Sequence, residues 1–159
     1  MPDNGPPALH ERFMRAALEE AQRAAERGDT GVAALLTHGG EIVSLSGSRV
    51  DSTGDPRAHA EMTVIGEACG RLGRARLCEC TLYTTMEPCP MCAWAILLAG
   101  IGTVVLGARH QALGRIDVGT YSLEGLLGMT GRSMTVLTVL EAECTEFRRA
   151  WQERSGRLV

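Results

Sequence analysis

Two cysteines three positions apart, Cys89 and Cys92, lie in the segment CTLYTTMEPCPMCAWAILLAG, after β-forming residues and before an apolar run that ends at Gly100. This order predicts a strand, a turn and then a helix whose first turn carries the pair. Residues at i and i+3 share one face of a helix, so both sulfurs can face one partner. A disulfide, a redox pair, a metal site and plain packing all use such spacing, and the rest of the chain must decide between them.

The rest of the sequence argues against disulfides. The N-terminal residues MPDNGPPALHERF lack the basic and then apolar segments of a secretion signal, so we expect a cytoplasmic protein whose thiols stay reduced. No apolar run approaches the roughly 20 residues that cross a bilayer, so no membrane partner is expected. The other four cysteines lack metal-ligand spacing and are expected to be small buried hydrophobic residues. They are Cys69, Cys78, Cys80 and Cys144.

Hydrophobic periodicity divides the 159 residues into alternating helices and strands. After an amphipathic helix that ends near Gly28, two strands form a hairpin around residues 38–40 and a loop leads to a second helix from about Ala58. The remaining expected elements are a strand at 80–85, a helix up to Gly100, a strand at 103–108, a loop, a short helix at 122–129, a strand at 133–140 and a terminal helix at 141–156. The pattern predicts an α/β fold, a three-layer α/β/α sandwich with a five-stranded mixed sheet and helices on both faces. One domain over residues 1–159 is expected.

The candidate partner of the cysteines is His59, in the tripeptide His59-Ala60-Glu61. A catalytic zinc site takes three nitrogen or sulfur ligands from the protein and leaves a fourth position to water, whereas a structural zinc site needs a fourth protein ligand. His59, Cys89 and Cys92 meet the first count. We expect His59 in the first turn of the second helix and the cysteines on a helix that begins near Pro88, with the two helix starts facing each other.

The combination of H-A-E with P-C-P-M-C resembles the signature of the zinc deaminases of the cytidine deaminase superfamily. The segments DPRAHAEM, LYTTMEPCPMC and TVVLGA are similar to the branch that holds tRNA adenosine, guanine and zinc-type cytosine deaminases. The branch of free cytidine deaminases usually has a three-cysteine site, which His59 excludes. The resemblance implies a cytidine deaminase-like fold, a homodimer and one Zn²⁺ per chain. Glu61 is then expected to take a proton from water and deliver it to the ring nitrogen and the departing amine.

The expected reaction is hydrolytic deamination of an amino-substituted nucleobase or a related small heterocycle, with release of ammonia. The residues expected to contact the substrate are Ser48, Ala60, Glu87 and Trp151, and a backbone N–H near Glu87 or Cys89 is expected to orient the water. Relatives usually carry asparagine at the position of Ser48, and a hydroxyl cannot make the two-point contact of an amide.

Two alternatives stay open, a tRNA-specific adenosine deaminase and a noncatalytic zinc-binding scaffold. The net charge of −3 and the pI near 5.8 give no support to a nucleic-acid partner, which is therefore not the favoured expectation. Arg148 and Arg149 are expected on a solvated helix face, with nucleic-acid contact as the alternative, and Trp94 is expected in the core.

Overall fold

The structure is a computed structural model that describes residues 6–115 and 117–157. Its elements follow the chain in the order α1 (Pro7–Glu26), β1 (Ala33–His38), β2 (Glu41–Gly47), α2 (Val50–Thr53), α3 (Ala60–Leu72), β3 (Cys80–Met86), α4 (Pro90–Ala99), β4 (Thr103–Ala108), α5 (Leu123–Thr130), β5 (Thr135–Thr138) and α6 (Glu141–Ser155). None of the helices in the described part of the chain combines the length and the apolar character that crossing a membrane requires.

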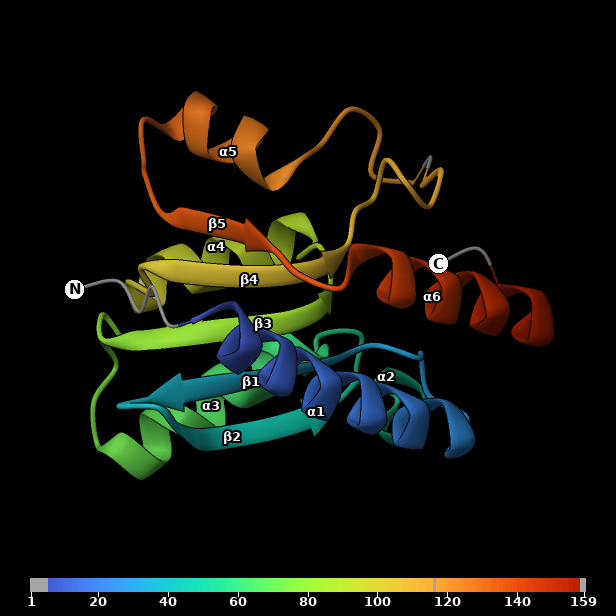
Figure 1. Cartoon of the computed structure of the whole chain (residues 1–159), viewed down its shortest axis with the longest axis horizontal. Coiled ribbons are helices and arrows are strands. Elements are labelled where there is room, and N and C mark those ends of the chain that lie inside the picture. Colours follow the sequence, from blue (N-terminus) through green and yellow to red (C-terminus); the bar gives the residue numbers. More distant parts are fainter. Residues whose placement is uncertain (1–5, 116, 158–159) are drawn as a thin grey trace.

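The five strands form one mixed sheet in the order β2-β1-β3-β4-β5. β1 is antiparallel to both β2 and β3, and β3, β4 and β5 run parallel to one another. Helices α1 and α6 lie on one face of the sheet, and α3 and α4 lie on the other (Figure 1). The three-layer α/β/α sandwich predicted from the alternation of helices and strands is confirmed.

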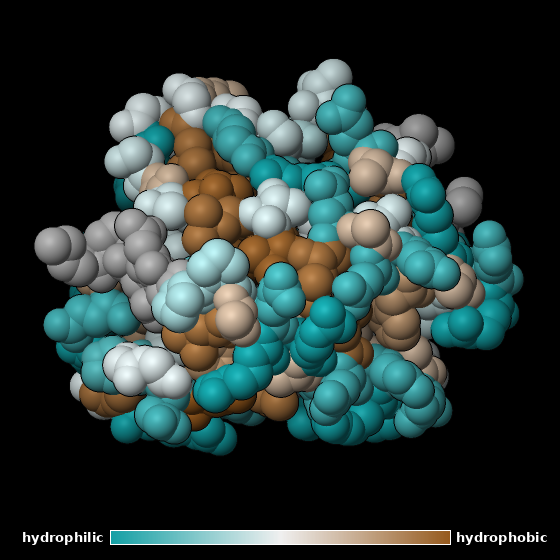
Figure 2. Space-filling view, viewed as in Figure 1, coloured by the Kyte–Doolittle hydropathy of each residue, from teal (hydrophilic) through white to brown (hydrophobic). Residues whose placement is uncertain are grey.

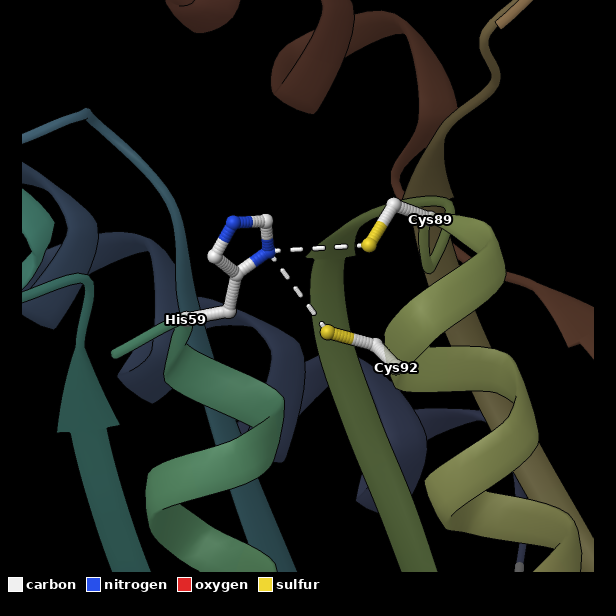
Figure 3. A group of neighbouring side chains, drawn as sticks. All are labelled: His59, Cys89 and Cys92. Atoms are coloured by element: carbon white, nitrogen blue, oxygen red, sulfur yellow. Dashed lines mark hydrogen bonds between the residues drawn. The ribbon is translucent and has the colours of Figure 1, made fainter. Parts of the chain in front are cut away.

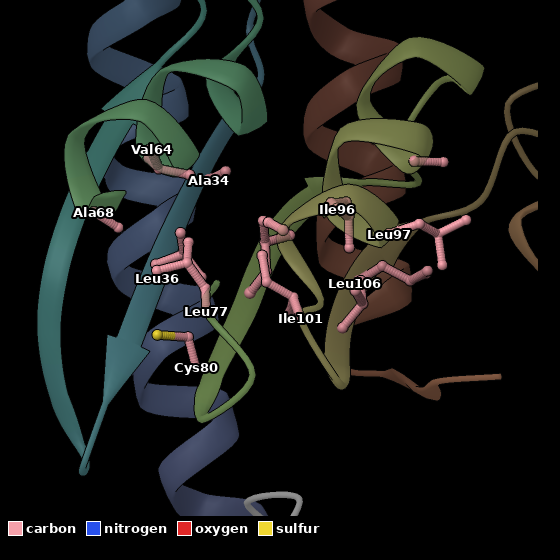
Figure 4. Close-up of a cluster of buried hydrophobic side chains, with 14 of the residues drawn as sticks. Ala34, Leu36, Val64, Ala68, Leu77, Cys80, Ile96, Leu97, Ile101 and Leu106 are labelled. Atoms are coloured by element: carbon pink, nitrogen blue, oxygen red, sulfur yellow. The ribbon is translucent and has the colours of Figure 1, made fainter. Parts of the chain in front are cut away.

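The core is divided by the sheet into two clusters, because successive side chains of a strand point to opposite faces. Leu36 and Leu106 belong to the cluster under α3 and α4 (Figure 4), whereas their neighbours Leu35 and Val105 belong to the cluster under α1. Every residue of β3 and β4 is buried, as expected for central strands with helices on both faces. The sheet is therefore a rigid base for the loops at its ends.

The face that carries α1 and α6 is mixed in polarity. Figure 2 shows hydrophobic residues gathered in the middle and upper part of this face, toward β4 and β5, with hydrophilic residues along α1 below them. Partly buried apolar side chains of the β5 region belong to the cluster on this side of the sheet, among them Leu137, Val139 and Leu140.

Three details differ from the expectations. The loop before the second helix contains the one-turn helix α2, because the carboxylate of Asp29 accepts hydrogen bonds of 3.0 and 2.9 Å from the backbone N–H groups of Asp51 and Ser52. Trp94 was expected in the core but is 41% exposed on α4. Cys78 was expected to be buried but is exposed, Cys69 is partly exposed, and Cys80 and Cys144 are buried as expected.

The parallel arrangement brings the functional segments to one edge of the sheet. β3 ends at Met86 and leads into α4, β4 ends at Ala108, and β2, which runs parallel to β3 across β1, ends at Gly47 just before Ser48. The carboxyl ends of three strands thus meet at the same edge, the place where α/β sheets commonly bind ligands.

Candidate active site

The three predicted metal ligands come from the starts of two helices. His59 is the N-cap residue of α3, and Cys89 is the N-cap residue of α4, with Pro90 at the first helical position and Cys92 two residues later. Both helices thus begin two residues after the predicted positions, and His59 lies just before the first turn and not within it. His59 and Cys89 both have extended backbone conformations, which point their side chains back across the helix ends (Figure 3). The positive ends of both helices favour the thiolate charge.

The distances between the donor atoms fit one tetrahedral zinc ion. Nδ1 of His59 lies 3.6 Å from Sγ of Cys89 and 3.6 Å from Sγ of Cys92. Ligand bonds of about 2.05 Å to nitrogen and 2.3 Å to sulfur at a tetrahedral angle would separate the two donors by about 3.6 Å. The three side chains are therefore positioned to hold one metal ion.

The group of three leaves room for a fourth ligand. Within residues 6–115 and 117–157, His59, Cys89 and Cys92 are the only group of three or more histidine, cysteine, aspartate or glutamate side chains whose ligand atoms all lie within 4.8 Å of one another. A structural zinc site would need one more protein ligand. The donor set is that of a catalytic site.

The thiols of Cys89 and Cys92 shift each other's pKa in opposite directions. The hydrogen bond with the Cys92 thiol, and to a lesser degree that with His59, lowers the pKa of Cys89 to about 4 although burial acts against it. The same hydrogen bond, together with burial, raises the pKa of Cys92. Without metal the pair thus shares one proton, and a bound divalent cation would replace it because zinc binds thiolates.

Glu61 is a buried carboxyl group next to the metal ligands. It is 3% exposed, and its Oε1 accepts a hydrogen bond of 2.9 Å from the Thr84 hydroxyl, while its Oε2 lies 3.6 Å from Sγ of Cys92. Burial, and secondarily the charge of Cys89, raise the pKa of Glu61. A raised pKa strengthens the carboxylate as a base, which suits a group that must take up a proton and pass it on.

A cavity of about 340 Å³ opens onto these groups. His59, Glu61 and Cys89 line it, and so do three of the four residues predicted to contact substrate, Ser48, Ala60 and Glu87. Ser48, directly after β2, is only 4% exposed.

Glu87 lines the cavity in a different way from the one expected. Its backbone N–H donates a hydrogen bond of 2.7 Å to the carbonyl of Ala108 and so is not free to orient a water molecule. Its carboxylate accepts hydrogen bonds of 3.0 Å from the N–H of His110 and 2.8 Å from the N–H of Leu123. The Glu87 side chain thereby ties down both ends of the segment from His110 to Leu123.

The structure does not bring the fourth predicted residue, Trp151, to the cavity. Its ring lies behind Arg148, with the guanidinium carbon of Arg148 4.2 Å from the ring centroid. Arg148 itself lines the cavity and is 2% exposed, so the prediction that it lies on a solvated helix face is wrong. Arg115 and Arg157 also line the cavity. Sequence reasoning missed all three, because they come from separate segments without a common motif.

Comparisons with known proteins agree with this geometry. The model of the family described as "Cytidine and deoxycytidylate deaminase zinc-binding region" matches residues 7–108. The chain is 43% identical over 106 residues to the tRNA-specific adenosine deaminase of Aquifex aeolicus (strain VF5), an alignment that covers 67% of this chain and 70% of that protein.

Two solved structures extend the comparison to the fold. One, from work on A-to-I editing by tRNA:A34 deaminases at the wobble position of transfer RNA, has a TM-score of 0.75 and 36% identity and covers 86% of this chain and 98% of that chain. The other, guanine deaminase from Bacillus subtilis, has a TM-score of 0.64 and 30% identity and covers 91% and 94%. With its zinc-ligand geometry, the chain belongs to the cytidine and deoxycytidylate deaminase family and is a zinc-binding hydrolytic deaminase that acts on C–N bonds.

Proposed function

We propose that this protein converts an amino-substituted nucleobase, or a related small heterocycle, to the oxo product and releases ammonia. The observation that carries the proposal is that Glu61 lines the same cavity of about 340 Å³ as the metal ligands His59 and Cys89. That volume lies at the small end of ligand pockets, where a single ring with its substituents fits.

Zinc held by His59, Cys89 and Cys92 would supply the Lewis acidity that makes water a nucleophile at neutral pH. The chain itself supplies the proton transfer. Glu61 takes a proton from the attacking water and passes it to the ring nitrogen, and a second transfer lets the amine leave as ammonia. The hydrogen bond from Thr84 fixes Oε1, and Oε2, 3.6 Å from Sγ of Cys92, is the oxygen on the side of the metal ligands that would carry this exchange.

The test is the substitution Glu61→Gln in the zinc-loaded protein. We expect one zinc per chain in both the wild type and the variant, measured by elemental analysis. Ammonia release should fall by about 10²-fold or more in the variant, because the amide cannot carry the proton. A matched control is Glu67→Gln, a partly exposed carboxylate on the same helix that pairs only with Arg71 across 4.0 Å among the described residues. Turnover retained by Glu61→Gln would contradict the role of Glu61.

The natural substrate is best sought by an ammonia-release screen. The panel contains guanine, cytosine, adenine, their nucleosides, pterins and triazines, because the cavity suits one substituted ring. Product formation from one of these that depends on Glu61 identifies the substrate class. If the folded, zinc-loaded protein releases ammonia from none of these compounds but deaminates tRNA, the proposal of a small substrate is wrong and the second candidate function is supported.

That second candidate is tRNA adenosine deamination. It is favoured by the relative from Aquifex aeolicus, named a tRNA-specific adenosine deaminase, at 43% identity and by the tRNA:A34 deaminase structure at 36% identity. An enzyme of this type takes a single flipped-out base into its pocket, and a small cavity is compatible with that. Inosine formed in tRNA that is incubated with the purified protein, and absent with Glu61→Gln, would establish this function.

We further propose that the whole chain acts as a single deaminase domain, that it works as a homodimer and that it is located in the cytoplasm. The homodimer is supported by an apolar stripe on α4, which Met91, Trp94 and Leu98 form with exposed fractions of 37%, 41% and 59%.

A further inference from the structure

Arg148 is a buried cation that lines the active-site cavity and has no ion-pair partner among the described residues. It comes from the middle of α6 and is 2% exposed, yet it lines the same cavity as His59 and Glu61. Among residues 6–115 and 117–157, its Nε and Nη1 atoms have no hydrogen-bond partner and its side chain forms no ion pair. Burial of an unpaired charge destabilises a fold, so the position calls for an explanation.

The position keeps its charge in spite of burial. Burial, followed by the positive charges of Arg115 and Arg157, lowers the pKa of Arg148 to about 10. That value is still well above neutral pH, and the guanidinium is therefore protonated when the protein works. The neighbouring cations increase the electrostatic cost, because like charges repel each other in a poorly solvated site.

The guanidinium is held in place from behind. The Trp151 ring lies 4.2 Å from the guanidinium carbon, within the range of a cation–π contact. Trp151 can pack so closely because the residue opposite is Gly31, where an added Cβ would lie 2.9 Å from Cδ1 of the ring. The arrangement orients Arg148 toward the cavity at low conformational cost.

The other charged groups of the cavity already have partners. Arg115 pairs with Asp117, and Arg157 pairs with Asp51 at 3.0 Å. The Glu87 carboxylate is bound by two backbone N–H groups, and Glu61 by Thr84. Arg148 is therefore the cation of the cavity wall that an incoming anion can pair with.

We propose that the substrate carries an acidic group, a carboxylate or a phosphate monoester, which pairs with Arg148 while the amino-bearing ring faces His59 and Glu61. The inference rests on the proposed function for the deamination step, and the binding step can be measured separately. The group should be terminal, because the guanidinium is buried in a cavity of about 340 Å³ and an internal phosphodiester continues in two directions. The substrate class is thus a small acidic amino-heterocycle, and an internal RNA nucleotide becomes an outcome to be excluded.

The experiment compares ligands that differ only in the acidic group. Zinc-loaded Glu61→Gln protein is titrated calorimetrically with cytidine and cytidine 5′-monophosphate, adenosine and adenosine 5′-monophosphate, and cytosine and cytosine-5-carboxylate. We expect the acidic member of at least one pair to bind about 10- to 100-fold more tightly, as a charged hydrogen-bonded pair allows. The phosphate pairs and the carboxylate pair distinguish the two sources of the anion. Equal binding within all pairs would overturn the proposal.

The effect is assigned to Arg148 by three variants in the same background. Arg148→Met should remove the preference for the acidic ligand, and Arg148→Lys should keep part of it. Arg149→Gln should leave it unchanged, because Arg149 is exposed and donates to the carbonyl of Ala112. Ligand-free Arg148→Met should melt at the same temperature as wild type or higher, since it removes an unpaired buried charge. A lower melting temperature together with an unchanged ligand preference would mean that Arg148 is structural and would overturn the proposal.

The two proposals fail in distinguishable ways. Tight binding of an acidic ligand that the wild-type enzyme does not deaminate would support the anion site and count against the proposed reaction. Deamination of neutral and acidic rings at equal efficiency would support the reaction and overturn the anion site. Deamination of tRNA that Arg148→Met abolishes, with no preference in the ligand pairs, would overturn the assignment of a small acidic substrate.

Discussion

At the scale of single residues, the six cysteines occupy environments that differ enough to be told apart chemically. Cys78 is exposed, whereas Cys144 is buried and burial raises its pKa to about 12. Alkylation proceeds through the thiolate, so a thiol with this pKa reacts very slowly at pH 8.

We therefore expect iodoacetamide at pH 8 to label Cys78 in the native zinc-loaded protein and to spare Cys144. Removal of zinc by a chelator should add Cys89, which is partly exposed and loses its metal bond. Peptide mapping by mass spectrometry measures the labelled sites. Labelling of Cys89 at the same rate with and without zinc would show that this thiol does not bind the metal.

Residue-scale predictions from sequence succeeded where the signal is local and failed where it is not. His59, Cys89 and Cys92 were found because a ligand pattern is written in two short segments. The burial of Arg148 was not predicted, because it depends on contact with Trp151 and on residues from another segment, Arg115 and Asp117, that line the same cavity. Trp94 looked like a core residue because its neighbours in the sequence are apolar, and nothing in that local pattern shows that the Trp94 side of α4 is exposed.

At the scale of elements, α3 carries the predicted zinc ligand His59 at its N-cap and, in its middle, a glycine that lowers the stability of the helix. Gly66 lies inside this helix on an exposed face, and a Cβ added there would have nothing within 4 Å. Alanine has a higher helix propensity than glycine by about 1 kcal/mol.

We expect Gly66→Ala to raise the free energy of unfolding by about 0.5–1 kcal/mol, measured by urea denaturation at equal zinc loading. The opposite result is expected for Gly107→Ala in β4, because a Cβ there would lie 2.4 Å from Sγ of Cys144 and 2.7 Å from the carbonyl oxygen of Thr85. Overpacking of this kind costs about 1–3 kcal/mol. Destabilisation by Gly66→Ala would mean that α3 is strained in a way the structure does not show.

Most elements were predictable because their signals lie within the element. Apolar periodicity located the strands and the long helices, and Gly28, Gly73 and Gly100 lie just after three helices. α2 was missed because its cap comes from Asp29, 22 residues away from Asp51 along the chain. The exact helix starts were missed by one or two residues, which is where capping and not periodicity decides.

At the scale of the whole molecule, the apolar stripe of Met91, Trp94 and Leu98 on α4 predicts how two chains meet. These residues are spaced by three and four positions and therefore form one stripe of the helix. The stripe begins two residues from Cys89, so a second chain bound there would lie beside the zinc site. Exposed apolar patches of this kind commonly mark protein interfaces.

We expect the wild-type protein to sediment as a dimer and Trp94→Glu to shift it to the monomer. Ile42→Glu serves as the matched control, because Ile42 is a similarly exposed apolar residue, 43% exposed, on the edge strand β2. A wild-type protein that sediments as a monomer at micromolar concentration would count against the dimer. A variant of Ile42 that dissociates the dimer would place the interface elsewhere.

The two hydrogen bonds that the Glu87 carboxylate accepts have a consequence for how such proteins acquire new substrate specificities. Because one carboxylate holds the chain at both His110 and Leu123, the two ends of the stretch between them stay fixed to the strand that leads into the zinc site, and residues between the ends can change with less effect on the catalytic groups. That stretch contributes Arg115, Asp117 and Val118 to the cavity wall. Among homologues, the residues that determine substrate choice should therefore vary most in this stretch, while the residues that carry out the reaction stay the same.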